Sequence, residues 1–236
     1  MGDSSSNADF DAKSPAPVRE YSAMVPAVNV GYDLVFLLTS CFLRARSQSK
    51  LELLVVGAGG GHEIQQFLPG NLGWRLLGVD PSQEMLALAR REAERVGAIE
   101  RVELIQGTAA DVPAARQFDA ATCLFVLHFL ADDAKVALLN AIRERLRPDA
   151  PLLVASAARL SSDELREDFL GAWQQHGQLM GLPGERMSEI IQQLVGQQEG
   201  ATDADDYARL LRDAGFPRVA PFLSVMNGAI VAWIAR

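Results

Sequence analysis

Short apolar runs alternate with helical patterns through the middle of this chain, and this alternation limits the fold more than any other feature. Five runs have the character of strands, at residues 51–56, 74–79, 102–106, 119–126 and 151–156. The first is apolar along most of its length, which is typical of a strand buried on both faces of a sheet. Hydrophobic residues between the runs recur at helical spacing. The pattern predicts a parallel, doubly wound α/β sheet.

The end of the chain departs from this alternation. A helix predicted over about 203–214 precedes two apolar, alternating runs, which are joined by Asn227-Gly228. This dipeptide is the strongest short signal for a tight β-hairpin. We therefore expect a mostly parallel sheet of seven strands that ends in an antiparallel hairpin. Residues 160–200 are helical in character but interrupt the alternation, and we expect a helical lid insertion there.

Hydrophobic spacing predicts four more helices, over about 32–46, 61–68, 82–96 and 132–146. In the first of these, the apolar positions at helical spacing are Leu34, Leu37, Leu38, Cys41 and Phe42. Residues 1–17 are polar and rich in Ser and Asp, so they bury too little apolar surface to offset the entropy of ordering. They are expected to form a flexible tail before one domain over residues 18–236.

Composition narrows the classes of function. The 236 residues include 30 acidic and 22 basic side chains, a net charge of −8, which disfavours a dedicated nucleic-acid surface. Cys41 and Cys123 lie far apart without metal-ligand spacing, so neither a disulfide framework nor a zinc site is expected. No secretory leader and no apolar run of membrane-spanning length is evident, and the predicted location is cytoplasmic without membrane partners.

A glycine-rich turn, Gly57-Ala58-Gly59-Gly60-Gly61, directly follows the first strand. Glycines allow positive φ and close approach of a ligand to the backbone, and the following helix offers free N–H groups. His62 stands where the dinucleotide pattern GxGxxG has its third glycine, whereas the spacing GxGxG is satisfied. This spacing disfavours NAD(P) and favours a nucleoside without a pyrophosphate. The alternative is a purely structural turn.

Asp80 ends the second strand, within the sequence LLGVDPS. A carboxylate at this position can accept hydrogen bonds from both hydroxyls of a ribose 2′,3′-diol. The alternative is that Asp80 caps the helix that follows.

Taken in order, four segments resemble the successive motifs of class I S-adenosylmethionine (SAM) methyltransferases: LELLVVGAGGGHEI, LLGVDPSQEML, IQGTAADVP and FDAATCLFVLHFL. RERLRPDAPLLVA and LLRDAGFPRV resemble the segments that follow them. The resemblance covers about residues 50–158 and 203–236. It implies a Rossmann-like fold, SAM as the methyl donor and S-adenosylhomocysteine (SAH) as the product.

The same resemblance implies a role for particular residues of this chain. Gly57, Ala58 and Gly59 would lie along the methionine moiety, in a loop that Gly61 completes. Asp80 would hold the ribose, with Pro81 beside the adenine. Four further positions match the motifs. Thr108 and Ala109 would flank the adenine, and Asp111 would accept a hydrogen bond from the exocyclic amine of the adenine. The backbone carbonyl of Leu124 would contact the amino-acid end of SAM. Cys123, Phe125 and Val126 are expected to belong to the core.

The chain also resembles the branch that contains the carboxy-SAM synthases of tRNA wobble-uridine modification. Val30-Gly31-Tyr32-Asp33 and LFVLHFL carry this likeness, which implies that Tyr32 lies next to the methionine end of SAM. The chemistry of that branch uses an arginine before the last helix to hold an additional carboxylate. The corresponding stretch here, SEIIQQLVGQQ, contains no arginine, and Arg186 is the nearest candidate.

Other polar residues have a functional and a structural interpretation. His128 is the candidate general base near the acceptor, or else a polar residue of the cleft wall. His62 is expected to be a turn or capping residue. Trp173, His176 and Met180 share one helix face, which either faces the transferred methyl group or packs on the sheet. Arg143, Arg145 and Arg147 are expected to form a solvated face near a helix end.

These observations favour an enzyme that transfers a methyl group from SAM to a small, partly apolar acceptor. SAM is already activated, so alignment and exclusion of water supply most of the catalysis. The alternatives are a carboxy-SAM synthase-like or tRNA-modification enzyme, and a SAM-binding module without turnover. A nucleic-acid partner is disfavoured by the acidic balance, and the protein is expected to be a monomer or a homodimer.

Overall fold

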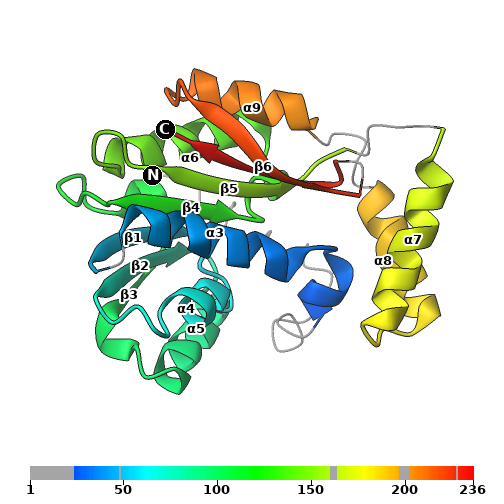
Figure 1. The fold of residues 1–236 in the computed structure, drawn as a ribbon, viewed down its shortest axis with the longest axis horizontal. Coiled ribbons are helices and arrows are strands. Elements are labelled where there is room, and N and C mark those ends of the chain that lie inside the picture. The colour runs from blue at the N-terminus through cyan, green and yellow to red at the C-terminus, as the bar shows by residue number, and fades with distance from the viewer. Residues whose placement is uncertain (1–23, 48, 160–163, 197–201, 227) are drawn as a thin grey trace, which may run out of the picture.

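A mixed sheet of seven strands organises the computed structural model, which describes residues 24–47, 49–159, 164–196, 202–226 and 228–236. The strand order is β3-β2-β1-β4-β5-β7-β6 (Figure 1). Strands β1 to β5 pair in parallel, whereas β7 runs antiparallel to β5 and β6. The predicted doubly wound sheet with a final antiparallel hairpin is therefore confirmed. The tail expected at the N-terminus lies outside the described residues.

The bounds of the elements agree with the predicted ones to within two residues. The strands are β1 (Leu51–Val56), β2 (Trp74–Asp80), β3 (Val102–Gln106), β4 (Ala120–Leu124), β5 (Leu152–Ala157), β6 (Val219–Val225) and β7 (Ile230–Ala235). The α-helices are α3 (Tyr32–Arg46), α4 (His62–Phe67), α5 (Gln83–Arg95), α6 (Asp132–Arg145), α7 (Arg166–Leu179), α8 (Gly184–Gly196) and α9 (Ala204–Asp213). Short 3-10 helices are η1 (Ile99–Arg101), η2 (Ala109–Asp111) and η3 (Leu127–Phe129).

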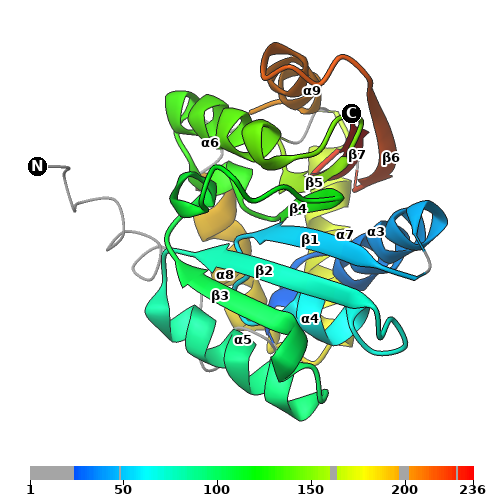
Figure 2. The same ribbon diagram turned by 90° about the vertical axis from the view of Figure 1, so that its left-hand side faces the viewer.

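Helices cover both faces of the sheet, with α6 and α9 on one side and α4 and α5 on the other (Figure 2). Strand β1 shows why both faces are apolar. Leu53 and Val55 pack into the core cluster that includes α3, α4 and α5, while Leu54 and Val56 pack into the cluster of α6 and α9. Alternate side chains of a strand point to opposite faces, so a central strand between two helical layers must be apolar throughout.

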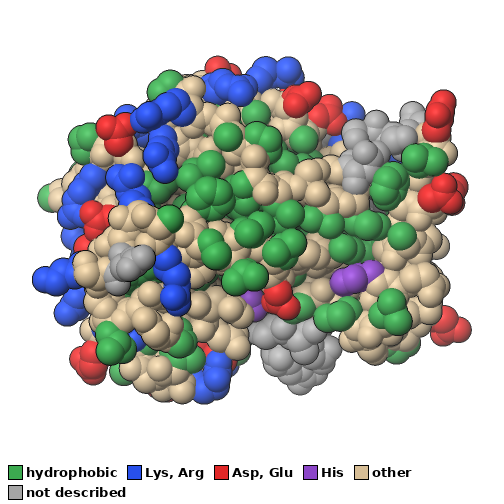
Figure 3. Space-filling model, viewed as in Figure 1, with side chains coloured by type: hydrophobic (Ala, Val, Ile, Leu, Met, Phe, Trp, Pro, Cys, Tyr) green, Lys and Arg blue, Asp and Glu red, His purple; other side chains and the backbone are tan. Residues whose placement is uncertain are grey.

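Helix α3 is present where predicted, but a different set of its residues packs against the sheet. Its buried residues are Tyr32, Val35, Phe36, Thr39, Ser40 and Leu43. Leu34 and Leu37 are 42% and 58% exposed, and hydrophobic side chains gather on this face of the molecule (Figure 3). The apolar stripe predicted the helix correctly but not its buried side. None of the helices in the described ranges is long and apolar enough to cross a membrane.

Helices α7 and α8 form most of the described part of the predicted insertion, beyond one end of the sheet (Figure 1). They pack against each other and against residues 24–28, which are helical. Trp173 Nε1 donates a hydrogen bond to the carbonyl of Val28 at 2.6 Å, and His176 Nδ1 lies 3.1 Å from the carbonyl oxygen of Ala27. The shared face of α7 therefore contacts the N-terminal segment, whereas Met180 is exposed.

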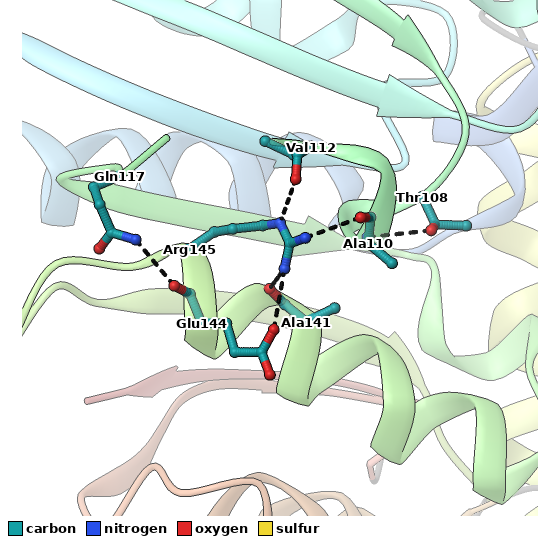
Figure 4. Close-up of polar contacts among 7 residues, drawn as sticks. All are labelled: Thr108, Ala110, Val112, Gln117, Ala141, Glu144 and Arg145. Atoms are coloured by element: carbon teal, nitrogen blue, oxygen red, sulfur yellow. Dashed lines mark hydrogen bonds and ion pairs between the residues drawn. The ribbon is translucent and has the colours of Figure 1, made fainter. Parts of the chain in front are cut away.

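Arg145 ties the end of α6 to the loop after β3 (Figure 4). Its guanidinium donates hydrogen bonds to the carbonyls of Val112 (2.9 Å), Ala141 (3.0 Å) and Ala110 (2.9 Å). The residue is only 6% exposed. The expectation of a solvated arginine face is wrong at this position, although Arg143 and Arg147 are exposed. The loop that Arg145 holds contains three of the predicted adenine contacts.

We predict that Arg145→Met lowers the free energy of unfolding by about 3 kcal/mol, because two loop carbonyls lose a charged donor in a buried place. Urea denaturation monitored by circular dichroism measures this. Arg143→Met, the same replacement at an exposed position of α6, should change stability by less than about 1 kcal/mol. Equal stabilities of the two variants would contradict a bracing role for Arg145.

Candidate functional site

The glycine loop, residues 57–61, connects β1 with α4 at the carboxyl edge of the parallel strands. Gly57, Gly59 and Gly61 have φ angles of 74°, 47° and 85°. A Cβ atom on Gly57 would lie 2.3 Å from Val126 Cγ2, so packing alone requires glycine there. At Gly59 the nearest atom would be 3.7 Å away, the carbonyl oxygen of Gly57. The next is Met85 Cε at 3.8 Å, so a Cβ atom at Gly59 would make only ordinary contacts, and the positive φ rather than packing favours glycine there.

Asp80 braces this loop from the neighbouring strand. Its Oδ2 accepts a hydrogen bond from Gly59 N at 2.9 Å, and its Oδ1 accepts one from Ser82 N at 2.9 Å. Asp80 is 5% exposed. The N-cap of α5 is Ser82, whose hydroxyl accepts from Met85 N, so the interpretation of Asp80 as the cap is wrong. Because Asp80 is buried and accepts the amide of Gly59, its removal also affects the loop itself.

A cavity of about 410 Å³ opens above the carboxyl ends of β1, β2 and β4. In an open α/β sheet this edge is where ligands bind. The lining residues are Tyr32, Phe36, Gly57, Ala58, Gly59, Gly60, His62, Glu63, Asp80, Pro81, Met85, Leu124, Phe125, Val126, Phe129, Leu130, Ala131 and Ala134. The acids among them are Glu63 and Asp80, and most of the others are apolar or glycine.

The cavity brings together most of the predicted donor-site residues. Those that line it are Tyr32, Gly57, Ala58, Gly59, Asp80, Pro81 and Leu124. Those placed outside its lining are Gly61, Thr108, Ala109 and Asp111. Gly61 is the N-cap of α4 instead, and a Cβ there would lie 2.9 Å from Ala89 Cα.

The loop after β3 lies beside Asp80, because Gly107 N donates a hydrogen bond to the carbonyl of Asp80 at 3.0 Å. Within this loop the Asp111 carboxylate turns back along the chain. Its Oδ2 accepts from Thr108 N at 2.7 Å and from Thr108 Oγ1 at 3.0 Å, which closes a capping box. Ala109 is fully buried. In this arrangement the hydrogen bonds of the Asp111 carboxylate stabilise the loop to which it belongs.

Aromatic rings form one wall of the cavity. The ring of Tyr32 lies 4.8 Å from that of Phe36 and 5.0 Å from that of Phe125, between ring centres. His62 packs against the same group, 4.3 Å from the ring of Phe36. Phe125 has a φ of 60°, a conformation that is rare for a non-glycine residue and clusters at functional sites. Val126 also lines the cavity, so only Cys123 of the three expected core residues is purely core.

Glu63 is the second residue of α4 and is 4% exposed. Burial raises the pKa of its carboxyl to about 8, and the negative charge of Asp80 adds to this effect. Its Oε1 has no hydrogen-bond partner within the part of the chain that the structure describes. Burial also lowers the pKa of the neighbouring His62, against the opposing effects of Asp33 and Glu92. Both side chains are therefore predominantly neutral at pH 7 in the free protein.

His128, the candidate base, lies in η3, and its Nδ1 is 3.4 Å from both Ser156 Oγ and Ala157 N. It is half-buried and stands outside the cavity lining. Burial, helped by the charge of Lys135, lowers the pKa of His128 to about 4. The imidazole is therefore neutral at physiological pH.

Helices α7 and α8 contribute none of the lining residues within their described parts. Trp173 and His176 are engaged by residues 24–28, so the expectation that they face the transferred methyl group is wrong. Arg186 is exposed, and its Nη1 pairs with Glu189 Oε2 at 3.0 Å. It stands outside the cavity lining as well.

Several lining residues were not identified from the sequence, among them Phe36, Glu63, Met85 and Phe129. Glu63 was the one with a signal in the sequence, since it is a carboxylate in the first turn of the helix that follows the glycine-rich turn at the ligand edge. The others are apolar residues whose spacing is equally compatible with a core position.

The chain is similar to known proteins in its domain, its sequence and its structure. Residues 54–152 match the model of a methyltransferase domain. A carboxy-S-adenosyl-L-methionine synthase of Pseudomonas putida is 26% identical over 90% of this chain and 87% of its own length. The magnesium protoporphyrin IX methyltransferase of Synechocystis, solved with bound SAH, superposes with a TM-score of 0.61 at 18% identity, covering 89% of this chain and 84% of that one.

A proposed O-methyltransferase of Nostoc punctiforme superposes with a TM-score of 0.65 at 17% identity. It covers 92% of this chain, which spans only 59% of that protein. At such identities the structural matches establish the fold, and the domain match concerns residues 54–152. With its seven-stranded sheet and glycine loop, the chain has the fold of the class I SAM-dependent methyltransferases; its residues 54–152 match a methyltransferase domain, and it is similar to the carboxy-SAM synthases.

Proposed function

We propose that the protein binds SAM in the cavity at the carboxyl edge of the sheet and transfers its methyl group to a small, partly apolar acceptor. The observation that carries this proposal is the pairing of Asp80 with the glycine loop. Both Asp80 oxygens accept a backbone N–H, and a carboxylate oxygen can accept more than one hydrogen bond. The ribose hydroxyls of the donor would be bound there.

The remaining donor contacts follow from the lining of the cavity. Gly57, Ala58 and Gly59 would run along the methionyl half, and Pro81 would pack beside the adenine. Tyr32 and Leu124 line the same cavity and would complete the donor site. Asp111 would reach the adenine amine only by giving up its contacts with Thr108. Thr108 and Ala109 would contribute through the position of their backbone.

The acceptor is proposed to occupy the apolar part of the cavity. Its wall is formed by the aromatic rings of Tyr32, Phe36 and Phe125 and by residues 129–131. Binding pockets for small molecules are commonly apolar with a few polar groups. Transfer is a displacement at the methyl carbon, in line with the departing thioether of SAH. The residues of the wall would hold the acceptor atom in line and keep water out.

A base is needed only if the acceptor must lose a proton, and His128 is the candidate. Its neutral imidazole can accept a proton, but its pKa of about 4 makes it a weak base. The ring would also have to reach the cavity from its place beside Ser156. Transfer that relies on alignment therefore accounts for more of the proposed catalysis than proton abstraction does.

Methyl transfer is favoured over the carboxy-SAM synthase reaction, which remains the second candidate because of the curated relatives. The negative charge of Asp80 in the cavity lining favours a donor with positive charge and disfavours one with an additional carboxylate. Arg186 pairs with Glu189 on the surface of α8. A SAM-binding module without turnover would share the donor site and differ only in the chemistry.

Calorimetry tests the donor assignment directly. SAM and SAH should bind, while NADH should give no measurable heat of binding, because the third-glycine position of the dinucleotide pattern is His62. Incubation with SAM and small hydroxyl- or amino-bearing acceptors should then accumulate SAH. A protein that binds NADH but not SAM contradicts the donor assignment. SAM binding without SAH formation for any acceptor would favour the non-catalytic module.

We predict that Gly59→Val weakens SAM binding at least about tenfold, whereas Gly60→Ala changes it less than about threefold. The valine would extend into the cavity, where no atom lies within 3.7 Å of the Cβ position. Gly60 has no positive φ, so alanine fits its backbone. Calorimetry measures both affinities, and thermal unfolding confirms that each variant is folded. Equal affinities would indicate that the loop is only structural.

A further inference from the structure

Glu63 is a buried acid for which the protein provides no cationic partner among the described residues. It is 4% exposed, it lines the cavity, and its Oε1 is unbonded. Burying a carboxylate without a partner is costly, and an unpaired buried acid remains protonated instead. Such a group is poised to bind a ligand that supplies the missing positive charge.

The surroundings of Glu63 are neutral or negative on every element that faces it. Asp80, at the end of β2, adds negative charge. Cys123, on β4, is a neutral thiol, because burial raises its pKa to about 12. His62, on the same helix, is neutral at pH 7, and the acids that act on it are Asp33 of α3 and Glu92 of α5. The local field therefore attracts a cation into the cavity.

The position of Glu63 indicates which half of the donor it would contact. It stands two residues after the glycine loop, in the first turn of α4. In the proposed function that loop runs along the methionyl half of SAM. This half carries both positive charges of the molecule, the sulfonium and the α-ammonium group. The adenosine half is neutral and would lie toward Asp80 and Pro81.

We propose that the Glu63 carboxylate is a specificity-determining residue that binds a cationic group of the donor's methionyl half. The inference rests on the proposed function and extends it to a residue outside the predicted donor set. Binding would convert Glu63 from the acid to the carboxylate, and its proton would leave to solvent. The sulfonium and the ammonium group share this chemistry, and SAH separates them because it keeps only the ammonium group.

The first test is Glu63→Gln, which keeps the shape of the side chain and removes its charge. SAM affinity at pH 7 should fall at least about tenfold. An equal loss for SAH assigns the ammonium group, and a loss confined to SAM assigns the sulfonium; both support the proposal. Unchanged affinity for both compounds overturns it. Glu84→Gln, at an exposed position of α5, is the matched control and should bind as the wild type does.

The second test is proton release, which a merely structural glutamate would not produce. Calorimetry of SAM binding at pH 7 in phosphate and in Tris measures the protons exchanged. The wild type should release a larger fraction of a proton than Glu63→Gln does, because its carboxyl has a pKa of about 8 when the cavity is empty. The difference should shrink as the pH rises above 8. Equal release by the two proteins overturns the proposal.

Failure of this proposal is distinguishable from failure of the proposed function. A wild-type protein that binds neither SAM nor SAH contradicts the function itself. Wild-type binding that survives Glu63→Gln unchanged contradicts only the role of Glu63. The variant should also remain folded, since glutamine is neutral and avoids the cost of keeping a buried acid protonated at pH 7, and its melting temperature should equal or exceed that of the wild type.

Discussion

Asp80 connects three segments at the carboxyl edge of the sheet, two through its carboxylate and one through its backbone carbonyl. One oxygen accepts the amide of Gly59 in the loop after β1, and the other accepts the amide of Ser82 at the start of α5. The backbone carbonyl of Asp80 accepts Gly107 N from the loop after β3. Hydrogen bonds from backbone N–H groups to a carboxylate are among the stronger ones in proteins. The end of β2 therefore fixes the position of all its neighbours at the ligand edge.

The electrostatics of the cavity follow from this arrangement. Both oxygens of Asp80 accept backbone amides, whereas Oε1 of the nearby Glu63 has no partner among the described residues, and the charge of Asp80 contributes to keeping Glu63 protonated. Two acids with such different surroundings can take different roles. Asp80 organises the glycine loop, and Glu63 is the acid that we propose binds a positively charged group of the donor. The aromatic rings of Tyr32, Phe36 and Phe125 add an apolar surface to the same cavity. A cavity lined by two acids and by aromatic rings is suited to a positively charged donor and an apolar acceptor.

Much of the fold was predictable because the strands that follow the alternation are buried between two helical layers. The glycine loop, Asp80 and Tyr32 were also predictable, since their positions at strand ends or in motifs determine them. The buried side of α3 was not, because several apolar residues lie on both of its faces. Arg145 and Glu63 were missed or misjudged for a common reason: burial of a charged side chain depends on tertiary contacts. The contacts of Trp173 with residues 24–28 likewise join segments far apart in sequence.

A crystal structure of the protein with SAH tests the central claim most directly. The account predicts that both ribose hydroxyls lie within hydrogen-bond distance of the Asp80 carboxylate while Gly59 N and Ser82 N keep their bonds to it. The methionyl half should then lie along residues 57–59, with the sulfur facing the rings of Tyr32 and Phe125. A ribose bound elsewhere, with Asp80 contacting only the backbone, would contradict the account.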